Sequence, residues 1–170
     1  MRNIEAKFRV RNVARTYERA TAIGFHKIDS FTQRDTFFAA RNGKLKLREQ
    51  AGAETTLIHY RRKRRDGLDL SNYHIVTVPD GNGMRNMLAD SLGVIAEVRK
   101  HRTLMVRRNI RLHFDQVENL GEFGELEAVL EANADITANQ REVREILAAF
   151  EIDGEDLIDQ SYFELLPPVA

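Results

Sequence analysis

Charged residues alternate with apolar ones in five short stretches of this sequence. Side chains two positions apart on a strand point the same way, so the charged members of each stretch would share one face. Lysine and arginine bind polyanions, carboxylates hold divalent cations, and phosphoryl chemistry needs both. The charged sets are Glu5 and Lys7; Lys46 and Arg48; Lys100 and Arg102; Arg111, His113 and Asp115; and Glu125 and Glu127.

The alternation leaves two arrangements of these charged faces open. A half-buried strand usually turns its charged face to water, which would make the chain a charge-balanced interaction domain. If the strands instead closed into a barrel with the charged faces inward, basic and acidic groups would converge on one cavity. Such a cavity could bind a polyanion together with a metal ion.

The elements that must position these residues are mainly strands. Residues 3–10 alternate strictly between polar and apolar types, and Asn42-Gly43 marks a hairpin between the runs 35–40 and 44–49. Five further strands are expected. They cover residues 55–62, 71–78, 95–105, 109–117 and 123–130.

Three longer segments space their apolar residues at helical intervals. They cover residues 13–23, residues 83–92 and a segment that begins near Thr137. About eight strands and three or four helices, without a repeating βαβ unit, favour a mainly antiparallel α+β fold.

The composition fits one domain. The chain has 170 residues, of which 42% are hydrophobic, and no Ser/Gly-rich or low-complexity stretch separates two halves. We therefore expect a single domain over residues 1–170. Because the sequence has no cysteine, oxygen or imidazole groups must hold any metal ion.

The charge balance argues against two classes of partner. Lysine plus arginine total 26 and aspartate plus glutamate total 26, whereas nucleic-acid and membrane binders usually carry a positive excess. The basic run Arg61–Arg65 lacks interleaved aromatic residues and is expected to be a solvated loop beside Asp66-Gly67. No run approaches 18 apolar residues, so we expect a cytoplasmic protein.

Six motifs, taken in order, resemble a known family. IEAKFR, DTFF followed by KLKLRE, KHR, RLHFD and LGEFGELE resemble the CYTH superfamily, or triphosphate tunnel metalloenzymes, over residues 3–130. SYFELL near the end resembles the terminal motif of the class IV adenylyl cyclase branch. The resemblance implies an eight-stranded antiparallel barrel or tunnel with helices packed outside, which holds a triphosphate with Mg²⁺ or Mn²⁺.

The resemblance also implies roles for individual residues. Glu5 and Lys7 match the last two positions of the signature E-x-E-x-K and would be catalytic. The basic position on the fourth strand matches Arg62 or its neighbour Arg61. The residues implied to bind triphosphate are Lys7, Lys46, Arg48, Arg62, Lys100, Arg102 and Arg111. Those implied to hold metal are Glu5, Asp115, Glu125 and Glu127.

One position departs from the family pattern, because the first signature glutamate is Asn3. A neutral amide oxygen is a weaker ligand than a carboxylate, so a complete two-metal site is in question. Three functions stay open: a class IV-like adenylyl cyclase that makes cyclic AMP and pyrophosphate from ATP; a triphosphatase acting on inorganic, thiamine or nucleoside triphosphate; and a non-catalytic triphosphate or nucleotide sensor. A homodimer is also expected, although no residue supports it.

Overall fold

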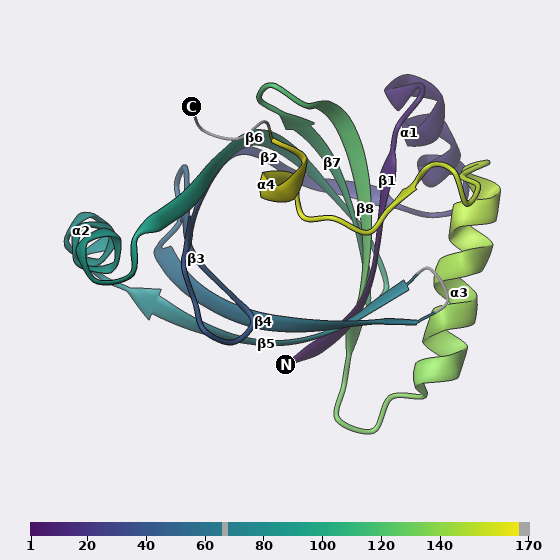
Figure 1. Cartoon of the computed structure of the whole chain (residues 1–170). Helices are drawn as coiled ribbons and strands as arrows, with labels where there is room; N and C mark the ends of the chain where they lie inside the picture. Colours follow the sequence, from purple (N-terminus) through teal and green to yellow (C-terminus); the bar gives the residue numbers. More distant parts are fainter. Residues whose placement is uncertain (66–67, 167–170) are drawn as a thin grey trace.

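Eight antiparallel strands close into a barrel in the computed structural model, which describes residues 1–65 and 68–166. Neighbouring strands follow the order β5-β4-β3-β2-β6-β7-β8-β1, and pairing of β1 with β5 closes the ring (Figure 1). The expected α+β fold with an antiparallel barrel is confirmed. The strands are β1 (Arg2–Arg9), β2 (His26–Phe38), β3 (Lys44–Gln50), β4 (Thr55–Arg65), β5 (Leu68–Val78), β6 (Val94–Arg107), β7 (Ile110–Val117) and β8 (Gly121–Leu130).

Helices surround the barrel. α1 (Val13–Ala22) and α3 (Ile136–Ala149) cover β1, β7 and β8, whereas α2 (Gly81–Leu92) packs beside β2 and β3. A two-residue strand, β9 (Leu157–Ile158), pairs with β1 and leads to α4 (Tyr162–Leu165) at one end of the barrel. Within the described ranges, no helix is long and apolar enough to span a membrane.

The two faces of β1 show why the charged faces point inward. Ile4, Ala6 and Phe8 are almost fully buried in the core that α1 and α3 share with the barrel wall. Residues between them therefore point into the barrel, and Glu5 and Lys7 line its interior. Both faces of the strand are covered, so the charged side of the alternation lies in the barrel and not in bulk water.

Two segments differ from the sequence-based expectation. β2 begins at His26, nine residues before the predicted start, because it pairs with β6 along almost its whole length. The first residues of β2 lack apolar alternation, so the sequence pattern does not show this part of the strand. The run Arg61–Arg65 is the end of β4 and not a loop, because it continues the ladder with β5. Asp66-Gly67 lie outside the described residues, as does the end of the predicted domain, 167–170.

A single glycine in β8 permits close packing between strand and core. A Cβ atom at Gly124 would overlap the ring of Phe8, which is fully buried and packs against Phe150.

Gly124→Ala should therefore destabilise the fold by about 1–3 kcal/mol. Each kcal/mol should lower the melting temperature by roughly 2–4 °C. Gly154→Ala is the matched control, because a Cβ there meets nothing within 4 Å. Equal melting temperatures of the two variants, measured by circular dichroism, would contradict this packing.

Candidate active site

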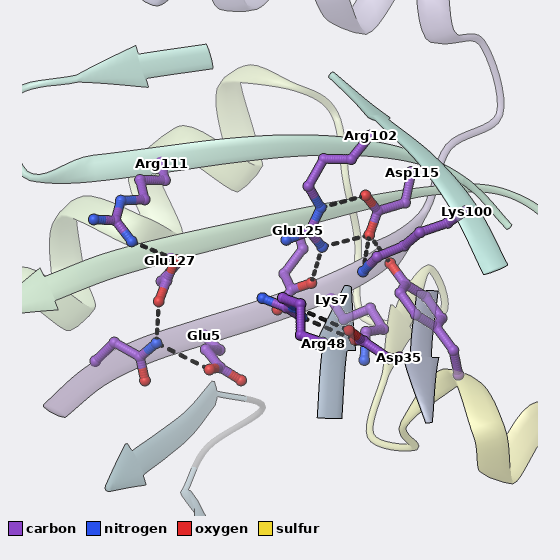
Figure 2. A network of polar contacts seen from close by, with 12 residues as sticks. Glu5, Lys7, Asp35, Arg48, Lys100, Arg102, Arg111, Asp115, Glu125 and Glu127 are labelled. Atoms are coloured by element: carbon purple, nitrogen blue, oxygen red, sulfur yellow. Dashed lines mark hydrogen bonds and ion pairs between the residues drawn. The ribbon is translucent and has the colours of Figure 1, made fainter. Parts of the chain in front are cut away.

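A cavity of about 330 Å³ runs through the barrel, lined by inward-facing residues of all eight strands and by Ser161 and Tyr162 at α4. Ten of the eleven residues predicted for the site line it, and Asp115 does not. Of the two arginines considered for the basic position on β4, Arg62 lines the cavity and Arg61 is exposed. Figure 2 shows most of these side chains turned toward one another. The lining members are Glu5, Lys7, Lys46, Arg48, Arg62, Lys100, Arg102, Arg111, Glu125 and Glu127.

A buried aspartate positions the two cations of β3 that line the cavity, Lys46 and Arg48. Asp35 on β2 accepts hydrogen bonds from Lys46 Nζ at 2.8 Å and from Arg48 Nε and Nη2 at 2.8 and 2.9 Å. The strand register places Asp35 directly opposite Arg48. Burial opposes ionisation of Asp35, but Arg48 and Lys46 outweigh it and hold its pKa well below the usual range. Asp35 was not among the predicted site residues, although it lines the cavity from β2 together with Gln33 and Phe37.

A second buried aspartate, Asp115, positions two cations of β6, Lys100 and Arg102. Asp115, fully buried, accepts hydrogen bonds from Arg102 Nε and Nη2, both at 2.6 Å, from Lys100 Nζ at 3.2 Å and from the Tyr162 hydroxyl at 2.9 Å (Figure 2). Arg102 also contacts Glu125 at 3.1 Å. Both oxygens of Asp115 are thus engaged, and a metal ion there would have to displace these partners. Its predicted metal role stays a prediction.

Carboxylates also gather on β1 and β8, which pair with each other beside β7. The register sets Glu5 opposite Glu127, and the Asn3 amide nitrogen donates to Glu5 Oε1 at 3.0 Å and to Glu127 Oε1. Arg62 pairs with Glu5 at 2.7 Å, and Arg111 with Glu127 at 3.5 Å. Burial, with the charges of Glu125 and Glu127, raises the pKa of Glu5 despite Arg62. Asn3 therefore holds together two carboxylates that would repel each other.

This carboxylate pair fits a divalent cation that shares its ligands with phosphate. Mg²⁺ usually takes one or two carboxylates and completes its shell with substrate phosphates and water. Glu5 and Glu127 meet that requirement, and Asn3 would add a third oxygen if its amide, whose nitrogen now donates to both carboxylates, turned to present its unpartnered Oδ1 to the ion. Among residues 1–65 and 68–166, no three acidic or histidine side chains form a metal site by themselves. The residues present thus suit an ion that binds together with a triphosphate.

Lys7 lies between the carboxylates and the closed end of the cavity. Its register partner is Glu125, its Nζ donates to the Gln160 carbonyl at 3.2 Å, and it stands 4.3 Å from the centroid of the Tyr162 ring. Burial lowers the pKa of Lys7 to about 8, although Glu125 opposes the shift. Arg102 and Lys7 hold the pKa of Glu125 below its usual range despite burial. Lys7 is therefore an ammonium group at neutral pH, already oriented toward the cavity.

The segment at α4 closes one end of the cavity. Lys44 binds Ser161 Oγ at 2.6 Å and Glu164 at 2.7 Å, and the Phe163 ring lies 4.6 Å from that of Phe37. Tyr162 is buried against Phe123 and donates to Asp115. In Figure 1, α4 lies within the outline of the ring of strands, near β2 and β6. The opposite end, where Ile75 is 42% exposed, is the open mouth of the cavity.

Comparison with known proteins agrees with this geometry. A closed barrel with cations and carboxylates inside defines a class of charged-tunnel proteins, and the CYTH domain model matches residues 1–162. The chain belongs to the CYTH family. A protein of Methanocaldococcus jannaschii, provisionally named an adenylate cyclase, is 27% identical over 97% of this chain and 98% of its own length. Members of the family are adenylyl cyclase-like or triphosphatase enzymes, and membership implies dependence on a divalent metal.

Solved structures show the same fold. The Pyrococcus horikoshii protein PH1012 superposes with a TM-score of 0.87 at 18% identity, covering 97% of this chain and 99% of its own. A Hippeastrum protein, provisionally named an adenylyl cyclase and described as revealing a dominant triphosphatase activity, has a TM-score of 0.67 at 16% identity, covering 96% of this chain and 94% of its own.

Three expectations from the sequence stay predictions. They are the absence of nucleic-acid partners, the cytoplasmic location and the homodimer.

The environment of Lys46 predicts pH-dependent binding of triphosphate. Burial and the nearby Arg48 lower the pKa of Lys46 to about 7, so its charged form dominates only below that pH. A bound phosphate raises the pKa of Lys46. The affinity for triphosphate should therefore fall as the pH rises from about 7 toward the pKa of Lys46 in the complex. The loss of one charged hydrogen bond corresponds to about tenfold or more in affinity.

Calorimetric titration with a non-hydrolysable ATP analogue between about pH 6 and pH 9 measures this effect. Lys46→Arg keeps its charge throughout that range, so its pH profile reports the ligand and every other titrating group, Lys7 included, without the contribution of Lys46. The wild-type affinity should fall about tenfold more than that of Lys46→Arg. Parallel pH profiles would show that Lys46 does not contact the triphosphate.

Proposed function

We propose that this protein is a metal-dependent adenylyl cyclase that binds ATP in its tunnel and releases cyclic AMP and pyrophosphate. The observation that carries the proposal is the convergence of seven cationic side chains and four carboxylates on one cavity that is closed at the α4 end. The cations are the predicted triphosphate ligands, and the carboxylates are Glu5, Asp35, Glu125 and Glu127. A linear polyanion with a bound divalent cation complements such a lining in charge and shape.

The cations are oriented before substrate arrives. Asp35 fixes Lys46 and Arg48, and Asp115 fixes Lys100 and Arg102. Groups that are already aimed at developing charge need little reorganisation in the transition state, which is where electrostatic catalysis gains most. These four side chains would therefore hold the phosphate chain and stabilise the leaving pyrophosphate.

The proposed reaction is an intramolecular displacement. The ribose 3′ oxygen bonds to the α-phosphorus, the bond from that phosphorus to the oxygen bridging to the β-phosphorus breaks, and the hydroxyl proton is released. Glu5 and Glu127, with Glu125 beside them, would hold a divalent cation, which supplies charge stabilisation and a lowered pKa of the attacking hydroxyl. Lys7 would neutralise the charge that develops on the leaving group. These are the catalytic roles we assign to Glu5 and Lys7.

A triphosphatase is the second candidate, and the similarity to the Hippeastrum protein favours it. In that reaction, water attacks the γ-phosphorus, and the bond to the oxygen bridging to the β-phosphorus breaks. Orthophosphate and a diphosphate are the products. The same charged lining serves both reactions, so only their products separate them.

Product analysis tests the proposal. The pure protein is incubated with ATP, and separately with inorganic triphosphate, in Mg²⁺ and then in Mn²⁺. Cyclic AMP with equimolar pyrophosphate supports the cyclase, whereas orthophosphate without cyclic AMP assigns the triphosphatase. Binding without any product would instead point to a sensor in which Asn3 has replaced the first signature glutamate.

Adjacent arginines on β4 provide a matched pair of variants. Arg62 lines the cavity and pairs with Glu5, whereas Arg61 is exposed on the other face of the strand. Arg62→Ala should lower kcat/KM for ATP by about 10- to 100-fold, the effect of one charge-assisted hydrogen bond, and Arg61→Ala should leave it unchanged. Steady-state kinetics, with thermal melts to confirm folding, measure both variants. Equal losses in the two would place the phosphates outside the tunnel.

A further inference from the structure

Three buried polar atoms without a hydrogen-bond partner lie on the neighbouring strands β1, β5 and β4. They are Asn3 Oδ1, Ser71 Oγ and Arg62 Nε. The register sets Ser71 directly opposite Asn3 on one side and directly opposite Arg62 on the other, and all three side chains line the cavity. A buried polar atom without a partner is rare in folded proteins and needs a specific explanation. Three such atoms at one place in the lining indicate that the site has a second arrangement, in which they are paired.

The amide of Asn3 turns its nitrogen toward the two carboxylates of the site. This nitrogen donates to Glu5 Oε1 at 3.0 Å and to Glu127 Oε1 on β8. Because β1 lies between β8 and β5, the oxygen of the same amide is turned away from Glu127, on the side where Ser71 lies. Asn3 is only 2% exposed and Ser71 only 1%, so bulk solvent satisfies neither side-chain oxygen. Both oxygens are left unpaired in this orientation of the amide.

A rotation of the Asn3 amide by 180° exchanges the positions of its nitrogen and oxygen. The terminal torsion of asparagine is broad and roughly two-fold, and the two ends of the amide have nearly the same shape, so both orientations fit the same space. In the rotated orientation, the oxygen faces Glu5 and Glu127 and can coordinate a divalent cation held between them. The nitrogen then faces Ser71 Oγ, which can accept a hydrogen bond from it. Both unpaired oxygens gain a partner in one movement.

We infer that Ser71 is the residue that allows Asn3 to serve as a metal ligand. When a divalent cation binds to the two glutamates, the Asn3 amide turns, and the Ser71 hydroxyl holds it in the turned orientation. The ion replaces the amide nitrogen as the positive partner of both carboxylates, and phosphate and water complete its shell. Ser71 is a positioning residue, because it contacts the ligand and not the ion. The inference rests on the proposed function only for the location of the ion and not for the reaction.

Removal of the Ser71 hydroxyl should weaken metal binding. In Ser71→Ala the turned amide has no acceptor for its nitrogen, and the dissociation constant for Mn²⁺ should rise about tenfold, as is usual when a group that orients a metal ligand is lost. Thr36→Val is the matched control. Thr36 is also almost fully buried and has an unpartnered hydroxyl, but it does not line the cavity, so Mn²⁺ binding should not change. Electron paramagnetic resonance of free Mn²⁺, titrated with the protein without triphosphate, measures both variants.

A double variant separates this role from a general loss of packing. Asn3→Ala removes the amide that Ser71 holds, so adding Ser71→Ala to it should cause no further loss of Mn²⁺ affinity. Thermal melts show which variants fold, and Ser71→Cys, whose sulfur is only a weak acceptor, takes the place of Ser71→Ala if that variant does not fold.

Three results would overturn the inference. They are a further tenfold loss in the double variant, an unchanged Mn²⁺ affinity in the Ser71 variant, and a wild-type protein that binds no Mn²⁺. The proposed function is tested separately by its products. If Mn²⁺ binding depends on Ser71 and Asn3 as expected but no cyclic AMP is formed from ATP, the inference holds and the cyclase assignment fails.

Discussion

The structure depends on pairing cations with carboxylates inside a closed barrel. Charged groups lose hydration when they leave water, and an unpaired buried charge is strongly destabilising. Asp35 and Asp115 meet this constraint for four cations, and each also fixes the geometry of the side chains it pairs. A bound triphosphate would add negative charge to this lining, so the same pairs that permit folding also prepare the site.

The constraint explains the sequence pattern of the strands. β1 has Ile4, Ala6 and Phe8 facing the helices, and Asn3, Glu5 and Lys7 facing the cavity, so both sets are covered. An ordinary amphipathic strand would expose its polar face to solvent. The helices α1 and α3 cover the outer face of β1 and complete the core there. The charged face of the strand must therefore point into the barrel.

The charged pairs on β3, β6 and β8 were predictable from alternation, and so were their shared faces. The alternation could not give the direction in which those faces point, because the same pattern serves an outward surface; only the family resemblance favoured the interior. Asp35 was missed because the N-terminal part of β2 lacks apolar alternation, so the predicted strand began at that residue. Asn3 looked like a weakened ligand, whereas the structure shows its amide joining Glu5 and Glu127.

A crystal structure with Mn²⁺ and a non-hydrolysable ATP analogue would test the central claim most directly, because the anomalous signal of manganese locates the ion independently of the nucleotide. The account predicts phosphates in contact with Lys46, Arg48, Lys100 and Arg102, and manganese beside Glu5 and Glu127. Phosphates on the outer surface of β4, with an unchanged set of ion pairs inside the barrel, would contradict it.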